Sequence, residues 1–267
     1  MSAKPRSRQR SRKRRSKKTP WWRATQPSFL TIGLVALALA GAAYVWPHVR
    51  PAETAGRDVP AAAPLPQAVP PEPADTRARP ADTYRGWARG LSPELDIPVV
   101  ALQAYAYAQV TAARTHPGCK LSWTLLAGIG RIESDHGRYG GARLRADGTS
   151  SPRIIGVPLD GAPGLMTITD TDGGRLDGDR RYDRAVGPLQ FIPTTWKRHG
   201  ADGDGDGRKN PFDIDDAAMA AARYLCHGGR DVSTSAGWQQ AVLSYNRTME
   251  YVRSVYGYAD GYARKSR

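Results

Sequence analysis

The residue best suited to acid–base chemistry in this 267-residue chain is Glu133. It follows Leu126 and Ile129 by seven and four residues, so its carboxyl group continues the apolar stripe of a predicted helix. Burial disfavours the charged form of a carboxyl group and raises its pKa, as a general acid near neutral pH requires. The alternative is a surface carboxylate paired with a neighbour such as Arg131. The place on the apolar stripe favours a partly buried catalytic acid.

A second group of carboxylates is typical of calcium-binding loops. Asp202, Asp204 and Asp206 occupy positions one, three and five, and Gly207 follows where an EF-hand loop turns sharply. Arg208 stands at position seven, the next ligand position of such a loop. The alternative is a flexible acidic turn that holds no metal. The spacing predicts a structural Ca²⁺ site in this loop.

Three motifs follow one another along the chain. They are Ile-Glu-Ser-Asp-His-Gly at 132–137, Gly-Pro-Leu-Gln-Phe-Ile-Pro at 187–193 and Ser-Tyr-Asn at 244–246. In this order they resemble the signatures of lytic transglycosylases, most closely the B-type branch. The resemblance implies a mainly α, lysozyme-like domain that cuts the MurNAc–GlcNAc β-1,4 bond of peptidoglycan without adding water. Glu133 would serve as acid and then as base, leaving a 1,6-anhydro-MurNAc end.

The resemblance also implies residues that bind the substrate. The positions that match the sugar cleft of the family are Gln190, Tyr224, Tyr245, Asn246 and Tyr251. Their polar tips would bind N-acetyl and hydroxyl groups, while the rings would pack on pyranose faces. From spacing alone, Tyr245 also fits a helix core, Asn246 a helix cap, and Gln190 a residue that satisfies backbone groups in its loop.

The resemblance bears on the metal loop and on the cleft wall as well. It points to Asp216 as the residue that closes the calcium loop, whereas the EF-hand register places Asp213 at position twelve. Both also suit a helix N-terminus, so the choice between them stays open. Pro188 and Leu189 depart from the family pattern, which leaves the shape of the cleft wall open. No cofactor is implied for catalysis.

Two other functions compete with this interpretation. One is a muramidase-type hydrolase, and the other is a non-catalytic peptidoglycan-binding module. Hydrolytic glycosidases generally use a second carboxylate as base or nucleophile. Asp135 is near, but two residues further along a helix it points about 200° away from Glu133. The lack of an obvious second carboxylate in the sequence favours the transglycosylase, and an intact Glu133 and Gln190 argue against the binding module.

Helices must position these residues. Apolar residues at three- and four-residue spacing predict helices at 99–114, 122–136, 194–199, 216–227, 236–246 and 248–262. A Gly- and Asp-rich insertion, 138–186, offers only short strand candidates at 153–157 and 165–169. Its Asp-rich stretch, 170–179, lacks the calcium register and predicts tight turns. Long irregular insertions in compact domains generally serve a function.

The N-terminal part predicts a membrane anchor. Residues 1–28 hold eleven Lys or Arg and no acid, so most of the net charge of +14 lies in this tail. An uncharged apolar run, 29–46, follows; as a transmembrane helix it would span about 27 Å, and Trp22 and Trp46 suit its two interfaces. Basic residues beside such a helix stay cytoplasmic, which disfavours a nucleic-acid role. The alternative is a cleaved signal peptide.

Both alternatives export the rest of the chain. Pro- and Ala-rich residues 47–92 predict a disordered linker, and 93–267 predict one catalytic domain that begins at a helix signal, Ser92-Pro93-Glu94. Cys119 and Cys226 would lie where disulfides persist, with two buried thiols as the alternative. We expect a single-pass protein of the cell membrane, with a cytoplasmic N-terminus, an extracytoplasmic catalytic domain and peptidoglycan strands as its partner. No protein partner follows from the sequence.

Overall fold

The structure is a computed structural model that describes residue 70 and residues 79–266. Helices make up most of this part, as the sequence predicts. The α-helices are α2 (Arg85–Leu95), α3 (Val99–Thr115), α4 (Trp123–Ser134), α5 (Pro193–His199), α6 (Ile214–Leu225), α7 (Ser235–Tyr245) and α8 (Met249–Lys265). Short 3-10 turns are η2 (Pro80–Tyr84), η3 (Pro117–Cys119) and η4 (Tyr139–Gly141). Two antiparallel pairs join β1 (Arg143–Leu144) to β2 (Ser150–Ser151) and β3 (Ile155–Pro158) to β4 (Arg184–Val186).

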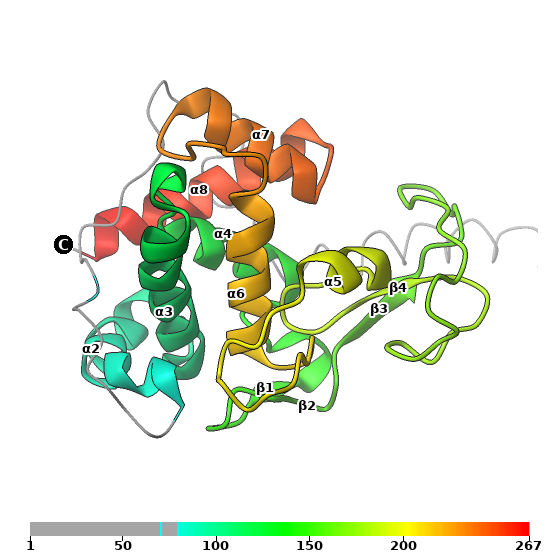
Figure 1. Ribbon diagram of the computed structural model, residues 1–267, viewed down its shortest axis with the longest axis horizontal. Helices are drawn as coiled ribbons and strands as arrows, with labels where there is room; N and C mark the ends of the chain where they lie inside the picture. The colour runs from blue at the N-terminus through cyan, green and yellow to red at the C-terminus, as the bar shows by residue number, and fades with distance from the viewer. Residues whose placement is uncertain (1–69, 71–78, 267) are drawn as a thin grey trace, which may run out of the picture. The chain divides into compact units, whose positions relative to one another are not determined.

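Buried alanines shape the contact between α3 and α6. The two helices lie side by side, and α7 and α8 pack on each other (Figure 1). The buried alanines are Ala101, Ala104, Ala106, Ala108 and Ala112 in α3, and Ala217, Ala218, Ala220, Ala221 and Ala222 in α6. Alanine has high helix propensity and a small side chain, so both helices form readily and their backbones approach closely.

The helix that carries Glu133, α4, is buried almost throughout. The Ser122 hydroxyl accepts a hydrogen bond from the backbone N–H of Thr124 at 3.2 Å and so caps its N-terminus. All residues from Trp123 to Gly130 are buried. A Cβ added to Gly128 would lie 2.8 Å from the carbonyl oxygen of Val255 in α8. Glycine therefore permits a close contact between α4 and α8 that a larger residue would prevent.

The folded domain begins before the predicted boundary at residues 92 and 93. The α2 helix packs on the core through Ala88 and Leu95, which are almost fully buried. Before it, the Arg79 guanidinium donates a hydrogen bond of 2.8 Å to the buried carboxylate of Asp215 at the start of α6. The predicted linker, 47–92, therefore includes most of α2, which belongs to the domain.

The helix signal Ser92-Pro93-Glu94 marks the end of a helix and not the start of one. These residues form the last turn of α2, with Pro93 inside the helix. The Ser92 hydroxyl donates to the carbonyl oxygen of Ile97 at 2.7 Å, across the turn that follows. Proline and serine suit the first turn of a helix in general, but here the apolar face of α2 packs on the core and outweighs that preference.

The Gly- and Asp-rich insertion forms turns and short strands. The predicted strand at 153–157 corresponds to β3, whereas 165–169 forms only isolated bridges through Thr167 and Thr169. One carboxylate oxygen of Asp170 accepts the backbone N–H groups of Asp172 and Gly173, at 3.0 and 2.9 Å. The structure therefore confirms tight turns in this stretch.

The predicted tail 1–28, the apolar run 29–46 and most of the predicted linker lie outside the described residues. Among the residues that the structure does describe, no helix has both the length and the hydropathy to cross a bilayer.

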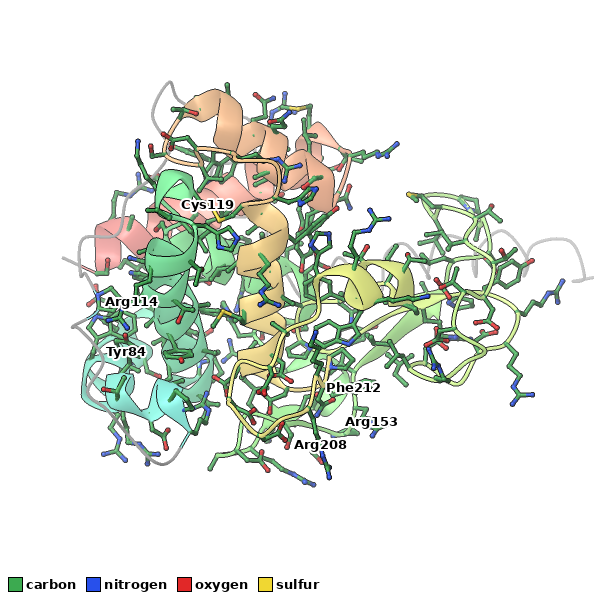
Figure 2. All side chains as sticks on the ribbon, in the orientation of Figure 1. Tyr84, Arg114, Cys119, Arg153, Arg208 and Phe212 are labelled. Atoms are coloured by element: carbon green, nitrogen blue, oxygen red, sulfur yellow. A yellow bond between two sulfur atoms is a disulfide. The ribbon has the colours of Figure 1, made fainter. Side chains whose placement is uncertain are left out.

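The predicted disulfide is confirmed. Cys119 and Cys226 are bonded, with their Cα atoms 5.4 Å apart and a separation of 107 positions in the sequence. Figure 2 shows the yellow sulfur bond near the label of Cys119. The bridge ties η3, just before α4, to the C-terminal end of α6.

We predict that Cys119→Ser combined with Cys226→Ser lowers the free energy of unfolding by about 2–4 kcal/mol, because the unfolded chain loses a long covalent loop. Urea denaturation of the wild-type and double-variant chains measures the difference. Thiol titration of the unfolded, unreduced wild-type chain should find no free thiol. Two titratable thiols in that sample would contradict the bridge.

Candidate active site

The carboxyl group of Glu133 lies at the C-terminal end of α4 and faces α8. Its Oε1 accepts a short hydrogen bond from the hydroxyl of Tyr251, in the first turn of α8. Glu133 keeps part of its surface exposed, whereas Tyr251 is buried. Burial raises the pKa of Glu133 from 4.5 to about 7, and the Tyr251 hydrogen bond opposes this rise. The carboxyl group therefore changes its charge near neutral pH, which suits a general acid.

Asp135, the other carboxylate of the first motif, is engaged in ion pairs. It ends α4 in the left-handed conformation, with φ of 52°. Its carboxylate accepts hydrogen bonds from the guanidinium groups of Arg131 and Arg138. The charge of Asp135 is thus neutralised within an ion-pair cluster.

The loop that carries Gln190 is fixed to the end of α4. The hydroxyl of Ser134, next to Glu133 in the chain, donates a 2.5 Å hydrogen bond to the carbonyl oxygen of Pro188. The same hydroxyl accepts the backbone N–H of Gly137 at 2.8 Å. Ser134 is buried, so both hydrogen bonds are shielded from water. The second motif is thereby placed beside the first.

Gln190 adopts a left-handed backbone conformation, with φ of 49°. Its side-chain amide donates to the carbonyl oxygen of Gly187 at 2.8 Å, within its own loop. A Cβ on Gly156 would lie 2.9 Å from the Gln190 side-chain oxygen, so this side chain packs against β3. In this structure, Gln190 satisfies a backbone carbonyl of its loop, as the alternative in the sequence analysis stated.

Tyr245 and Tyr224 form an aromatic wall beside Glu133. Burial, and next the Glu133 carboxylate, raise the pKa of Tyr245 well above its ordinary value. The Tyr245 hydroxyl donates to the carbonyl oxygen of Leu189 at 2.8 Å, and the Tyr224 hydroxyl to that of Ser244 at 2.5 Å. The two rings pack 5.7 Å apart. Both hydroxyl protons are therefore directed at backbone oxygens.

Asn246 ends α7 and is exposed. Its side-chain oxygen accepts the backbone N–H of Thr248 at 3.2 Å, and the Thr248 hydroxyl donates to the same oxygen at 3.1 Å. Thr248 in turn caps α8 by accepting the N–H of Tyr251 at 3.2 Å. Asn246 thus helps to set the turn that brings Tyr251 to Glu133.

His136 belongs to the first motif, but its spacing alone predicts no role for it. The side chain is fully buried, and its two ring nitrogens lie 3.2 Å from the Tyr105 hydroxyl and 3.0 Å from the Tyr262 hydroxyl. Burial, followed by the charges of Arg131 and Arg138, lowers the pKa of His136 well below its ordinary value. His136 is therefore a neutral link between α3, α4 and α8. Its contacts come from residues more than 30 positions away, so no local sequence pattern predicts them.

The predicted calcium loop brings together some of its candidate ligands. Oxygen atoms of Asp202, Asp204 and Asp216 lie within 4.8 Å of one another. Asp216 is buried and accepts the backbone N–H groups of Gly203 and Asn210 at 2.6 and 2.7 Å. Asp206 is exposed and accepts only the N–H of Arg208 among the hydrogen bonds of the described residues. Asp206 and Arg208 are outside the group.

The structure also separates Asp213 from Asp216. Asp213 precedes α6 and caps it by accepting the N–H of Asp215 at 2.8 Å. Burial, opposed by its backbone hydrogen bonds and assisted by the carboxylates of Asp204 and Asp202, raises the pKa of Asp216 to about 7. A hard cation would relieve this repulsion, so the donor set fits Ca²⁺. A second group, formed by Asp170, Asp172 and Asp183, also brings carboxylates within 4.8 Å.

The comparison with family models identifies the class of domain. Residues 181–254 match the transglycosylase SLT domain. This segment contains the second and third motifs, with Gln190, Tyr224 and Tyr245. For this part of the chain, the match bears out the transglycosylase family predicted from the motifs.

The comparison with solved structures found SltB3 from Pseudomonas aeruginosa in complex with NAG-anhNAM-pentapeptide. It shares 17% sequence identity with this chain, with a TM-score of 0.36, over 87% of this chain and 78% of that one. No curated protein matches this chain.

We predict that Tyr251→Phe raises the pKa of Glu133 further, because the variant loses a hydrogen bond that favours the carboxylate. The basic limb of the pH profile of kcat should move to higher pH, since the acid stays protonated longer. Glycan cleavage assayed at intervals of about one pH unit, from about pH 5 to about pH 9, would measure the shift. Tyr107→Phe in α3 is the control. A basic limb that stays in place or moves to lower pH would contradict the assigned contact.

Proposed function

We propose that this protein is a membrane-anchored lytic transglycosylase of the B-type branch that cleaves the MurNAc–GlcNAc β-1,4 bond and forms 1,6-anhydro-MurNAc. The observation that carries the proposal is the Glu133 carboxyl group, which is buried enough to hold a proton near pH 7 and contacts the hydroxyl of Tyr251. The transglycosylase domain match supports peptidoglycan as the substrate.

The proposed reaction uses Glu133 twice. In the first step the protonated carboxyl group donates its proton to the glycosidic oxygen, and the bond between that oxygen and C1 of MurNAc breaks. In the second step the carboxylate removes the proton from the C6 hydroxyl of the same sugar, and the C6 oxygen bonds to C1. No water is added, and Glu133 ends in its protonated state. The Tyr251 hydroxyl stabilises the carboxylate between the two steps.

The pairing of Asp135 supports this reaction over hydrolysis. A hydrolase of the two-carboxylate kind places its second carboxyl group about 5–9.5 Å from the acid, where it acts as nucleophile or activates water. Asp135, the other carboxylate of the first motif, forms ion pairs with Arg131 and Arg138. The oxygen atoms of this carboxylate are thus already engaged in ion pairs.

We predict that the full chain releases muropeptides ending in 1,6-anhydro-MurNAc from purified peptidoglycan, and that Glu133→Gln abolishes this release. Glutamine preserves the volume but transfers no proton, and acid–base catalysis contributes about 10²–10⁴-fold in rate. Mass spectrometry of the products is the measurement, with the exposed Glu250→Gln as the matched control. Products that carry an added water would favour the hydrolase, and tight binding without any release would favour the binding module.

The same variant has a stability signature that tests whether it folds. The folded state raises the pKa of Glu133 from 4.5 to about 7, so it binds this proton more tightly than the unfolded state does. Wild-type stability should therefore fall as the pH rises from about 4.5 to about 7, and Glu133→Gln should not show this loss. Denaturation at pH 4 and pH 8 should find about equal stabilities at the lower pH and a more stable variant at the higher pH. A variant that is less stable at both would not be a valid test of catalysis.

We also propose that Asp202, Asp204 and Asp216 hold a structural Ca²⁺. Three carboxylates converge at one point, and the loop joins the segment after α5 to the start of α6. Calcium would supply no catalytic chemistry there. It would neutralise the repulsion between the carboxylates and fix the loop, because binding to the folded state alone adds stability.

We predict that calcium at about 100 times its dissociation constant raises the unfolding free energy by about 2.7 kcal/mol, and that Asp202→Asn with Asp204→Asn removes this increase. Thermal melts with calcium and with chelator measure the effect. The control is Asp147→Asn with Asp160→Asn, which also changes two carboxylates that accept backbone N–H groups in turns. A wild-type melt that ignores both calcium and chelator would rule out the site.

The membrane anchor is proposed from the sequence alone. We predict that the chain fractionates with membranes and that Leu34→Arg with Leu37→Arg releases it, since each central Arg costs about 2.5–3.5 kcal/mol of insertion. Carbonate extraction followed by immunoblotting measures the fraction, and Leu34→Ile with Leu37→Ile is the control. A soluble wild-type product that has lost its N-terminal segment would instead support the cleaved signal peptide.

A further inference from the structure

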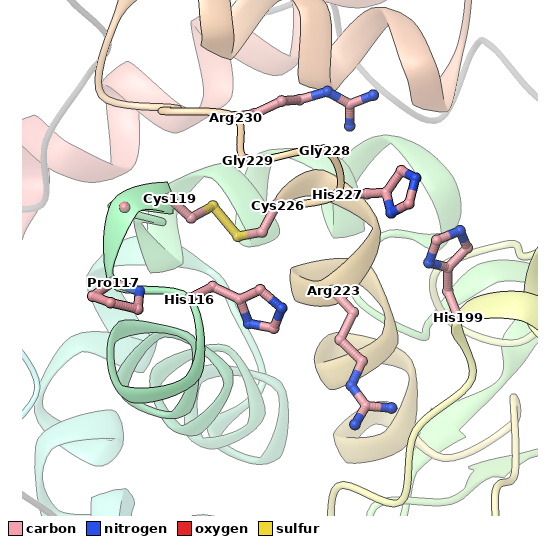
Figure 3. A pocket seen from close by; sticks show the side chains of 11 residues that line it. His116, Pro117, Cys119, His199, Arg223, Cys226, His227, Gly228, Gly229 and Arg230 are labelled. Atoms are coloured by element: carbon pink, nitrogen blue, oxygen red, sulfur yellow. A yellow bond between two sulfur atoms is a disulfide. The ribbon is translucent and has the colours of Figure 1, made fainter.

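A pocket of about 460 Å³ lies beside the disulfide, at the C-terminal end of α6. Its walls come from the η3 turn, the end of α5, the last turns of α6 and the segment before α7. Figure 3 shows the side chains of His116, His199, Arg223 and His227 around it, with the Cys119–Cys226 bond in its wall. None of the residues described above as catalytic or as calcium ligands lines this pocket.

The lining of this pocket is basic. Two arginines and three histidines face it, and none of the described residues that line it is acidic; the basic residues are His116, His199, Arg223, His227 and Arg230. Burial, and next the neighbouring His227, Arg198, Arg223 and Arg230, lower the pKa of His199. The guanidinium groups of Arg223 and Arg230 give this point positive charge, which would attract an anion.

The basic side chains differ in how far they are already engaged. Arg230 donates to the carbonyl oxygens of Tyr224 and Leu225, at 3.1 and 3.3 Å, and so has a structural role. Arg223 is exposed, and among residues 79–266 it forms no ion pair. His199 and His227 lie with their rings 5.4 Å apart at the same wall. Arg223 and this histidine pair are available to a ligand.

The chemistry of the lining favours an anion over a metal. Within the described residues, the groups that could hold a metal ion consist of Asp alone, and none of them lies in this pocket. A guanidinium group and the N–H of an imidazole ring both donate hydrogen bonds, and carboxylate oxygens accept them.

The pocket borders the aromatic wall beside Glu133. The ring of His199 packs 4.9 Å from that of Tyr224, and Tyr224 packs 5.7 Å from Tyr245. The Tyr245 hydroxyl binds the Leu189 carbonyl, next to the Pro188 carbonyl that Ser134 holds beside Glu133. A ligand that extends sideways from a sugar bound at Glu133 could therefore reach the basic pocket. The stem of peptidoglycan is such a ligand: it is a short peptide with free carboxylates, and four extended residues span about 13 Å.

We propose that this basic pocket binds a carboxylate of the peptide stem, through Arg223, His199 and His227, and thereby makes the enzyme prefer glycan strands that carry stems. This inference rests on the proposed function, because the stem must belong to the strand held at Glu133. The pocket acts on substrate choice and leaves the chemical step to Glu133.

The kinetic test compares the full chain with Arg223→Gln combined with His227→Gln. On peptidoglycan with intact stems, the variant should show a KM raised about tenfold with little change in kcat, because it loses charge-assisted hydrogen bonds to the substrate. On strands whose stems an amidase has removed, wild type and variant should have the same kcat/KM. Arg198→Gln removes a nearby charge that does not line the pocket and is the matched control. Equal losses on both substrates, or no loss on either, would overturn the proposal.

A binding test separates the pocket from catalysis. Imidazole NMR signals of His199 and His227 in the full chain are followed while three probes are added: a free tetrapeptide stem, the same stem with amidated carboxylates, and glycerol phosphate. The proposal requires the free stem to shift these signals and the amidated stem to leave them unchanged. Shifts by both stems alike, or by glycerol phosphate alone, would overturn it, and the latter would indicate a phosphate-containing wall polymer. If the chain cleaves no glycan at all, the proposed function fails, while this titration still decides whether the pocket binds carboxylates.

Discussion

The close contact between α4 and α8 is the constraint on which the candidate site depends. Gly128 lies so near α8 that a Cβ there would stand 2.8 Å from the Val255 carbonyl oxygen. At this distance α8 delivers Tyr251 to the Glu133 carboxyl group and Tyr262 to the His136 ring. The close packing of α4 and α8 thus buries the Glu133 carboxyl group and brings the Tyr251 hydroxyl to it. Burial raises the pKa of Glu133 to about 7.

A second set of contacts attaches the Gln190 loop to this helix pair. Ser134 holds the Pro188 carbonyl and Tyr245 holds the Leu189 carbonyl, so the loop is fixed from α4 and from α7. A Cβ on Gly187 would lie 1.7 Å from the Pro211 carbonyl oxygen, at the end of the predicted calcium loop. The loop that lines the site is therefore packed directly against the loop with the acidic group. A cation that fixed the acidic loop would therefore also help to fix the Gln190 loop through this contact. It would take no part in the chemistry.

Among the ion pairs within residues 79–266, none includes Glu133. Asp135 is neutralised by Arg131 and Arg138, whereas the basic pocket begins beyond the aromatic rings of Tyr245 and Tyr224. A carboxyl group with no ionic partner holds its proton more strongly than one beside a cation. This separation allows one face of the site to donate a proton and another to attract anions, with neutral rings between them.

The sequence by itself determined what depends on local periodicity and composition. The apolar stripe before Glu133, the helix ranges, the tight turns at Asp170 and the pairing of Cys119 with Cys226 all followed from residues in one stretch or from a count of two. Only the tertiary structure decided how side chains from distant stretches are used. It assigned Asp216 to the acidic group and Asp213 to a helix cap, directed the Tyr245 hydroxyl to the loop backbone, and packed α2 into the domain. Each of these depends on a partner far away in the chain, and spacing along a sequence cannot specify such a partner because the approach is set by packing.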